Sequence, residues 1–299
     1  MDVSIIIVTY NTRQMTAECI DSICQKTSGV DFEIILVDNA SSDGSKEFFE
    51  KDDRVKYIYS QENLGFGKAN NKGAEVAQGK YLFLLNSDTL LENNAVKLFF
   101  DYMEKSEPCV ACCGCLLVDK NHERIHSFGS FHTLTNSIVE RCWPLDRFRL
   151  FLMLGKFPKY DNPKYEKSQE AFEVPFATGA ALFVKKEVSD RLGLFDPDYF
   201  MYSEDMDLQH RYFESGYKSV IIRSPRIVHL FGQSSKSGSV KKLEMMIKSL
   251  FLYMKKHYSS GYFFAFSALF KTAYSASFLL RRSRSIKEKR SHIRFVQKL

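Results

Sequence analysis

The sequence lacks several features that would assign the chain to other classes of protein. It has seven cysteines, and an odd number does not suit a disulfide framework. No basic leader precedes the first apolar run, which begins at Val3, so we expect no signal peptide. Together these absences predict a chain that is made and kept in a reducing cytoplasm.

Basic charge is scarce outside the C-terminal segment. The net charge is +6, but residues 281–299 hold eight Lys or Arg and one acid, Glu288. This segment contributes +7, which leaves −1 for residues 1–280. A nearly neutral globular part argues against a nucleic-acid-binding core, and the basic segment indicates a local attachment patch.

Long uninterrupted apolar runs are also missing. A membrane-spanning helix needs about 20 mostly apolar residues. Gly261–Leu280 comes nearest, but Lys271 and several serines interrupt it, and the eight cations follow. We interpret residues 259–299 as a segment lying in an anionic membrane surface, with Phe and Tyr toward lipid and cations toward headgroups. The alternative is a core helix packed on the rest of the protein.

The first hundred residues alternate between short β-branched runs and stretches with helical spacing. We expect strands over 3–9, 32–37, 55–59 and 81–85, and helices over 12–26, 67–78 and 92–105, with a further helix opening at Ser41. Later strands are expected at 109–118, 180–184 and 219–222, and a helix at 204–215. This alternation predicts an α/β fold with a mostly parallel sheet flanked by helices.

Four polar turns follow the first four predicted strands. In a parallel sheet such turns meet along one edge, where ligands bind. They offer small residues for close backbone approach, amides for base edges, and carboxylates for a ribose or a metal. The turns are Thr9-Tyr10-Asn11, Asp38 to Gly44, Asn63 to Asn71, and Asn86-Ser87-Asp88.

Two acidic positions stand out. Asp88 follows a buried strand, and its hard oxygen suits a divalent cation that carries a phosphate-bearing substrate. Glu204 and Asp205 open a predicted helix, whose dipole favours an ionised carboxylate in the first turn. The simpler alternatives are a turn residue at Asp88 and ordinary helix-capping acids at 204–205.

The sequence resembles the family 2 glycosyltransferases, which have a GT-A fold, and among them the rhamnosyltransferase-like branch. The resemblance covers about residues 3–257. The matching segments are Val8 to Asn11, Val37 to Gly44, Asn63 to Gly73, Leu85 to Asp88, Phe176 to Ala181, Ser203 to Leu208 and His229 to Ser234.

The resemblance implies roles for several of the matching residues. Asp205 would be the general base, and Glu204 beside it would be a second catalytic residue. Asp88 would bind Mg²⁺ or Mn²⁺, and His229 would complete the metal shell. The family often has Asp where this chain has Asn86, which leaves Asp88 as the main charged ligand. The nucleotide sugar would be bound by Thr9, Tyr10, Asn11, Asp38, Asn63, Gly65, Lys68, Asn86, Ser87 and Asp88.

These patterns lead to one expected organisation and function. Residues 1–235 would form the glycosyltransferase domain, with halves at 1–118 and 171–235 and an irregular insert at 119–170, and residues 236–299 would form a helical, basic membrane-associating extension. The enzyme would be inverting and metal-dependent. It would move a sugar, rhamnose or another hexose, from a nucleoside diphosphate to a hydroxyl of a lipid-linked or growing cell-surface polysaccharide, at the inner face of the cell membrane.

Two other functions stay open on the sequence alone. A non-catalytic nucleotide-sugar-binding membrane scaffold would fit the loss of a carboxylate at Asn86. A sugar-phosphate nucleotidyltransferase would need a glycine-rich basic loop after the first strand, and the turn from Thr9 to Arg13 has no glycine.

Weaker patterns predict no additional site. Cys109, Cys112, Cys113 and Cys115 fall within one predicted strand, which would send alternate thiols to opposite faces, and no second ligand pair follows at zinc spacing. The segment from Gly65 to Asn70 nearly matches a dinucleotide fingerprint but has Asn70 where the third glycine would stand. Trp143 would suit an acceptor groove or a small satellite core.

Overall fold

The structure is a computed structural model that describes residues 1–141, 170–230, 240–280 and 286–299. It separates into two compact units. Unit 1 comprises Met1–Ser130, Tyr160–Phe200 and Glu204–Ser237, and unit 2 comprises Phe131–Lys159, Met201–Ser203 and Gly238–Leu299. Trp143 and most of the expected insert lie outside the described residues.

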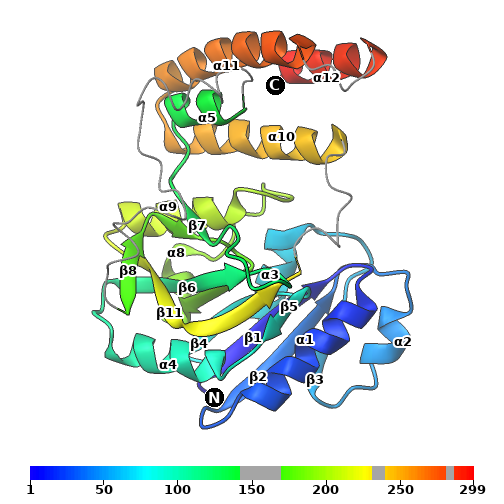
Figure 1. Cartoon of the computed structure of the whole chain (residues 1–299), viewed down its shortest axis with the longest axis vertical. Helices are drawn as coiled ribbons and strands as arrows, with labels where there is room; N and C mark the ends of the chain where they lie inside the picture. The colour runs from blue at the N-terminus through cyan, green and yellow to red at the C-terminus, as the bar shows by residue number, and fades with distance from the viewer. Residues whose placement is uncertain (142–169, 231–239, 281–285) are drawn as a thin grey trace. The chain divides into compact units, whose positions relative to one another are not determined.

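Unit 1 is built on a nine-stranded mixed sheet in the order β3-β2-β1-β4-β10-β6-β11-β5, with β8 also paired to β11 (Figure 1). A small second sheet pairs β7 (Phe128–Gly129) with β9 (Phe176–Ala177). The strands of the large sheet are β1 (Val3–Thr9), β2 (Phe32–Asp38), β3 (Val55–Tyr59), β4 (Tyr81–Asn86), β5 (Thr89–Leu91), β6 (Val110–Val118), β8 (Ala171–Val174), β10 (Ala181–Lys185) and β11 (Lys218–His229).

Helices cover both faces of this sheet. The described helices of unit 1 are α1 (Arg13–Lys26), α2 (Ser45–Phe49), α3 (Phe66–Ala74), α4 (Ala95–Lys105), α8 (Lys186–Leu192) and α9 (Glu204–Glu214). Side chains of α1, α2 and α4 pack with Ile5 and Ile7 in one buried cluster. Side chains of α3, α8 and α9 pack with Ile6 in the other. Because both faces are covered, the central strands are apolar at nearly every position.

The parallel part of the sheet brings the four polar turns to one edge, as predicted. Strand β1 pairs in parallel with β2 on one side and β4 on the other. The register places Thr9 opposite Asp38 and Val8 opposite Asn86. Strand β10 then runs antiparallel to β4, which makes the sheet mixed.

Several strands differ from the prediction: β7, β8 and β9 were not expected, and two further differences, at β5 and β11, matter for the site. Strand β5 was not predicted, because three residues carry little sequence pattern. Strand β11 continues to His229, well past the predicted end at 222. The two pair antiparallel, with His229 opposite Thr89, so each is stabilised by the other rather than by its own sequence.

Unit 2 is a group of helices comprising α5 (Leu134–Arg141), α10 (Val240–His257), α11 (Ser260–Leu280) and α12 (Ile286–Lys298). Helix α11 contacts the other three, and α5 comes from the segment expected to be an irregular insert. Among the described residues, no helix combines the length and hydropathy that crossing a bilayer requires.

The aromatic face of α11 forms the core of unit 2. Phe266, Phe270, Tyr274 and Phe278 are at most 1% exposed. The Phe251 ring of α10 lies 5.1 Å from that of Phe266 and 5.5 Å from that of Phe270. The expectation that the aromatic stripe faces lipid is therefore wrong for these four rings. Phe251 of α10 packs on Phe266 and Phe270, His292 of α12 contacts the rings of Tyr274 and Phe278, and burial of these apolar rings is favourable.

Candidate active site

The first two turns of the sheet edge are joined through Asn11. Its side-chain Oδ1 accepts hydrogen bonds from the backbone N–H of Ser42 at 2.7 Å and from the Ser42 hydroxyl at 3.2 Å. The Asn11 N–H in turn donates to the Ser41 hydroxyl at 3.0 Å. Asn11 has φ +55°, a left-handed conformation that asparagine tolerates better than most residues. These bonds hold the β1 and β2 turns in one fixed arrangement.

Asp38 and Thr9 are buried beneath those turns. Neither side chain is exposed. The Asp38 carboxylate accepts the Ser41 N–H and the Tyr57 hydroxyl, each at 2.8 Å, and burial together with this carboxylate raises the pKa of Tyr57. The Thr9 hydroxyl bonds those of Thr12 and Thr16. Of the residues expected to bind the nucleotide sugar, Asp38 and Thr9 hydrogen-bond within the turns, whereas Tyr10 is 49% exposed.

The third turn is attached to the second by a pair of amides. Asn39 Nδ2 donates to Asn63 Oδ1 at 3.0 Å and to the Gly65 carbonyl at 3.1 Å. Asn39 Oδ1 accepts the Leu64 N–H at 2.8 Å, and Asn63 Oδ1 also accepts the Gly65 N–H at 2.9 Å. Lys68, one turn further along α3, is exposed at this edge.

Gly65 allows a close backbone crossing that no other residue could. It has φ +80°, and a Cβ built at this position would lie 2.1 Å from the Phe200 carbonyl oxygen. The neighbouring Phe66 N–H donates to that same oxygen at 2.9 Å. The N-terminus of α3 is thereby tied to the end of the segment that precedes α9.

The fourth turn carries the acid and the histidine expected at the metal. Asp88 Oδ1 lies 3.1 Å from His229 Nε2, and the Leu230 N–H donates to the Asp88 carbonyl at 2.8 Å. Asn86 Nδ2 lies 3.4 Å from the same histidine nitrogen. The pairing of β5 with β11 therefore brings Asn86, Asp88 and His229 together from positions 143 residues apart.

A hydroxyl connects the fourth turn to the first. The Ser87 hydroxyl lies 3.1 Å from that of Thr12, which belongs to the buried set formed with Thr9 and Thr16. Ser87 is only 9% exposed. It therefore fixes the position of the turn between its two neighbours, Asn86 and Asp88.

The donor set of this turn fits a divalent cation. Carboxylate and amide oxygens suit Mg²⁺ and Mn²⁺, and imidazole is a common ligand of transition metals. Two neighbouring ligand atoms of an octahedral ion, each about 2.1 Å from it, lie about 3 Å apart. The 3.1 Å between Asp88 Oδ1 and His229 Nε2 matches that spacing. These two residues could hold the metal, with the Asn86 amide beside them.

Asp205 stands at the start of α9 and is held by two backbone groups. Its Oδ2 accepts the Gly179 N–H at 2.8 Å, and its Oδ1 accepts the Met206 N–H at 2.9 Å. Ala180, the residue after Gly179, accepts the Asn86 N–H through its carbonyl at 3.0 Å. The short segment Gly179-Ala180 thus bonds Asp205 on one side and the Asn86-Ser87-Asp88 turn on the other.

Glu204 has a different environment from Asp205. It is 6% exposed, and its Oε2 atom has no hydrogen-bond partner. Burial, followed by the neighbouring charges of Asp205 and Asp207, raises the pKa of Glu204 to about 8. Burial also raises the pKa of Asp205, but the N–H groups of Gly179 and Met206 oppose that rise. The negative charge of the pair is therefore better stabilised on Asp205.

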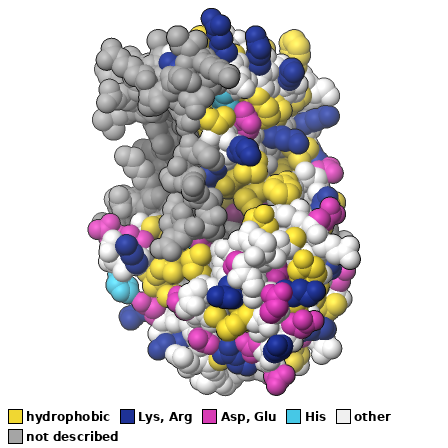
Figure 2. All heavy atoms as spheres, turned by 90° about the vertical axis from the view of Figure 1, so that its right-hand side faces the viewer, with side chains coloured by type: hydrophobic (Ala, Val, Ile, Leu, Met, Phe, Trp, Pro, Cys, Tyr) yellow, Lys and Arg dark blue, Asp and Glu magenta, His cyan; other side chains and the backbone are white. Residues whose placement is uncertain are grey.

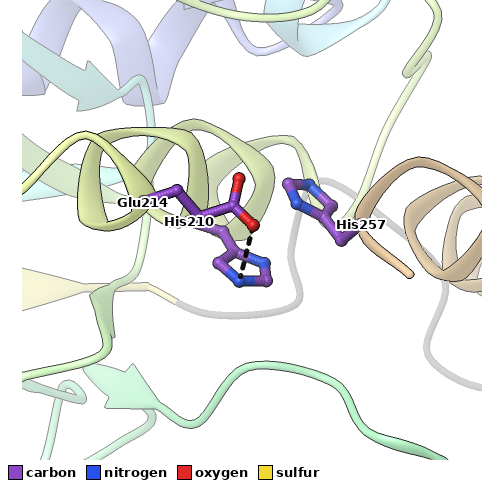
Figure 3. A group of neighbouring side chains, drawn as sticks. All are labelled: His210, Glu214 and His257. Atoms are coloured by element: carbon purple, nitrogen blue, oxygen red, sulfur yellow. Dashed lines mark ion pairs between the residues drawn. The ribbon is translucent and has the colours of Figure 1, made fainter. Parts of the chain in front are cut away.

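The rest of α9 is held in place by hydrogen bonds and an ion pair within unit 1. Gln209 exchanges hydrogen bonds of 2.7 and 2.8 Å with the backbone of Ala177, and the buried Asp207 carboxylate pairs with Arg211 at 2.9 Å. Figure 3 shows the last turns of the helix, where His210 and Glu214 form an ion pair at 3.8 Å. The third labelled side chain there, His257, ends α10 of unit 2.

Sequence reasoning did not assign site roles to several of these residues. Gly179 was part of a matching segment, but its N–H bond to Asp205 had no sequence signal. Tyr57 and Gln209 act through long-range contacts with Asp38 and Ala177, at sequence separations of 19 and 32. No local pattern marks such partners, because they depend on strand pairing and helix packing.

The cysteine-rich strand β6 carries no candidate metal cluster within the described residues. Cys113 and Cys115 face one core cluster and Cys112 the other, as strand alternation predicted. All three are buried free thiols, and burial raises the pKa of Cys112 and Cys115 to about 12. They therefore pack as small neutral apolar residues.

A family model described as "Glycosyl transferase family 2" matches residues 4–193 of the chain. Glycosyltransferase GlyG of Streptococcus pneumoniae is 30% identical over 109 residues, which is 35% of this chain and 36% of the relative. TuaG of Bacillus subtilis, named for teichuronic acid biosynthesis, is 28% identical over 130 residues, 42% of this chain and 51% of the relative. The chain thus matches about half or less of the length of these relatives.

Solved structures show the same fold. The structure of GalNAc-T7 with UDP, GalNAc and Mn²⁺ has a TM-score of 0.64 and 15% sequence identity, and the likeness covers 100% of this chain and 56% of that one. At this identity the likeness concerns the fold alone. It confirms the GT-A architecture predicted above.

Proposed function

Because the chain belongs to glycosyl transferase family 2, we propose that it is an inverting, metal-dependent glycosyltransferase that uses a nucleoside diphosphate sugar. The observation that carries the proposal is the Gly179-Ala180 segment. It bonds Asp205 through one residue and Asn86 through the next. This contact supports a common reaction centre for the acid expected to act as base and the turn expected to hold the diphosphate.

The proposed reaction is a direct displacement at the anomeric carbon. The acceptor hydroxyl attacks, a new C1–O bond forms, and the C1–O bond to the diphosphate breaks with its electron pair leaving on the diphosphate. The hydroxyl proton passes to the Asp205 carboxylate. Attack from the side opposite the leaving group inverts the anomeric centre.

The two carboxyls of the pair have different parts in this scheme. Asp205 accepts two N–H bonds and serves as the ionised base. Glu204, whose Oε2 lacks a donor, holds a proton and stays neutral. Neighbouring carboxyl groups whose environments give them different pKa values commonly take different acid and base roles.

Asp88 and His229 would hold Mg²⁺ or Mn²⁺, with Asn86 beside them. Such an ion stabilises the negative charge that develops on the leaving diphosphate. Tyr10, Asn11, Asn63, Gly65 and Lys68 would contact the nucleotide sugar, while Asp38, Thr9 and Ser87 hold their turns in place. The structure of GalNAc-T7, which contains UDP and Mn²⁺, supports a donor and cofactor of this type.

The proposed acceptor is a hydroxyl of a lipid-linked or growing cell-surface polysaccharide, and the transferred sugar is rhamnose or another hexose. The name of TuaG, with its teichuronic acid pathway, supports a cell-envelope glycan. Such an acceptor places the enzyme at the inner face of the cell membrane, attached as a peripheral protein through residues 259–299.

The proposal is tested by a donor screen followed by a transfer assay. Thermal shifts with nucleoside diphosphates and nucleotide sugars in Mn²⁺ identify the nucleotide, because a ligand of the native state raises apparent stability. Release of nucleoside diphosphate in the presence of metal then measures turnover. Binding without any release, with or without candidate acceptors, would favour the scaffold function over the enzyme.

A further inference from the structure

Helix α11 is apolar on its outward face as well as on its buried one. Phe264, Leu269 and Leu279 are 76%, 53% and 56% exposed. The remaining exposed positions from 264 to 279 are Ala265, Ala268, Thr272 and Ala276. At 100° per residue these seven positions span about 140° of the helix circumference. The hydroxyl of Thr272, the one polar group among them, donates to the Ala268 carbonyl at 2.9 Å.

This face differs from that of an ordinary surface helix. A surface helix of a globular protein presents charged or polar residues to water, and a helix that is apolar all round is normally covered. The opposite face of α11 is already occupied by Phe251 and the aromatic core of unit 2. The outward face, defined by Phe264, Ala265, Ala268, Leu269, Thr272, Ala276 and Leu279, therefore calls for a partner outside unit 2.

Cations are concentrated in the segment that contains the outward face. Residues 240–299 contain fourteen Lys or Arg and two acids. On α12, Arg290, Arg294 and Lys298 are exposed at four-residue intervals, which aligns them along one side of the helix. In Figure 2, Lys and Arg side chains project from unit 2 with hydrophobic side chains between them.

The cationic helix is fixed to the apolar one. The buried His292 of α12 contacts the Tyr274 hydroxyl of α11 at 3.1 Å and Glu244 of α10 at 3.3 Å. Lys289 Nζ donates to the Leu279 carbonyl at 2.8 Å. The outward face and the α12 cations are thus parts of one packed group of helices.

We propose that the outward face of α11 inserts into the surface of an anionic lipid bilayer while Arg290, Arg294 and Lys298 contact its headgroups. Apolar insertion next to clustered cations is the combination that binds helices to anionic interfaces. A second copy of the chain is a poorer occupant, because its basic helices would repel these. The inference rests on the proposed function only in that a membrane-bound acceptor gives the attachment its purpose.

The apolar part is tested with vesicles and the full-length chain. Co-sedimentation is measured with phosphatidylglycerol-containing and with pure phosphatidylcholine vesicles. Phe264→Ser should weaken binding to the anionic vesicles, and the triple variant Phe264→Ser, Leu269→Ser, Leu279→Ser should weaken it by about ten-fold or more. Phe48→Ser is the matched control, because Phe48 is an equally apolar ring that is 50% exposed on α2 of unit 1, and it should bind as wild type does.

The electrostatic part has its own variant. Replacing Arg290, Arg294 and Lys298 by Gln should reduce binding to anionic vesicles roughly a hundred-fold at low salt and leave the weaker binding to neutral vesicles unchanged. Added salt should weaken wild-type binding in the same way.

Three results would overturn the proposal. The first is a wild-type chain that does not bind anionic vesicles. The second is a triple serine variant that binds them as well as wild type does. The third result is a wild-type dimer, measured by sedimentation velocity without lipid, that is lost in the triple variant. It would assign the outward face to a second copy of the chain. Donor hydrolysis is followed in the same samples. Hydrolysis without vesicle binding by the wild-type chain contradicts only the membrane-binding role of the outward face, and vesicle binding without hydrolysis contradicts only the proposed enzyme.

Discussion

His229 and Asp88 meet at the end of the sheet, with Nε2 of the histidine 3.1 Å from Oδ1 of the aspartate. The contact exists because β5 and β11 pair antiparallel and place His229 opposite Thr89, the residue after Asp88. A carboxylate and an imidazole at this separation fit neighbouring ligand positions of one divalent cation.

His229→Ala should raise the Mn²⁺ concentration that gives half-maximal donor turnover by about ten-fold or more. The substitution removes one of the two proposed ligands and leaves Asp88 in place. The control is His122→Ala, an exposed histidine paired with Glu92 at 3.5 Å, which should leave the Mn²⁺ dependence unchanged. An unchanged dependence in the His229 variant would remove this residue from the metal site.

Asp88→Ala should weaken both metal and donor binding, because it removes the charged ligand of the turn. Isothermal titration with a nucleoside diphosphate, in the presence and in the absence of Mn²⁺, measures the effect. We expect donor affinity in Mn²⁺ to fall to the level measured without metal. Wild-type affinity in Mn²⁺ would contradict the assignment of Asp88.

Asp205→Asn should lower kcat by at least about 100-fold and leave donor affinity nearly unchanged, since general-base catalysis contributes about 10²–10⁴. The amide keeps the shape of the side chain but cannot take the acceptor proton. Glu204→Gln should lower kcat far less than Asp205→Asn does, because an amide resembles the neutral acid proposed there. Equal losses in the two variants would show that Glu204 needs its negative charge.

Stability should fall as pH rises from about 4.5 to about 8, in part because of Glu204. Burial raises its pKa in the folded protein to about 8, above its ordinary value of 4.5. Between these values the native state keeps a proton that the unfolded chain has lost, so raising the pH favours unfolding. Urea unfolding at pH 5 and pH 8 should show a smaller loss for Glu204→Gln than for wild type. Parallel losses would mean that Glu204 titrates normally.

Gly65→Ala should destabilise unit 1 by about 2 kcal/mol or more, because it adds a clash to a strained backbone. The new Cβ would meet the Phe200 carbonyl at 2.1 Å. Gly216→Ala separates the two effects, since Gly216 has a similar φ of +85° with nothing within 4 Å. It should cost about 1 kcal/mol, the usual penalty of the left-handed conformation alone. Equal costs in chemical denaturation would show that the crossing relaxes.

The sequence was most informative where apolar runs were long and their period was clear. Strands β1 and β3 begin and end at the predicted residues, and helix α9 begins at Glu204 as expected. The meeting of four polar turns at one edge also followed from the order of parallel strands. Strand β5 could not be predicted, because three residues have no period of their own.

Contacts between distant segments decided the rest of the site. The resemblance predicts Asp38 and Thr9 as nucleotide-sugar contacts; the structure shows that both are buried and that their side chains bond the neighbouring turns. Likewise, the aromatic stripe of α11 was expected at lipid, and it packs on Phe251 instead. Polarity identified these residues as important, but it did not say which neighbours would cover them.

The sequence by itself determined the family, the α/β alternation and the chemical inventory of the site, since composition, periodicity and short motifs are local properties of a chain. Only the tertiary structure decided which oxygens of the Glu204-Asp205 pair accept hydrogen bonds and which side of α11 stays exposed. Those outcomes depend on the pairing of strands and the packing of helices, which are stabilised by contacts between residues far apart in the sequence.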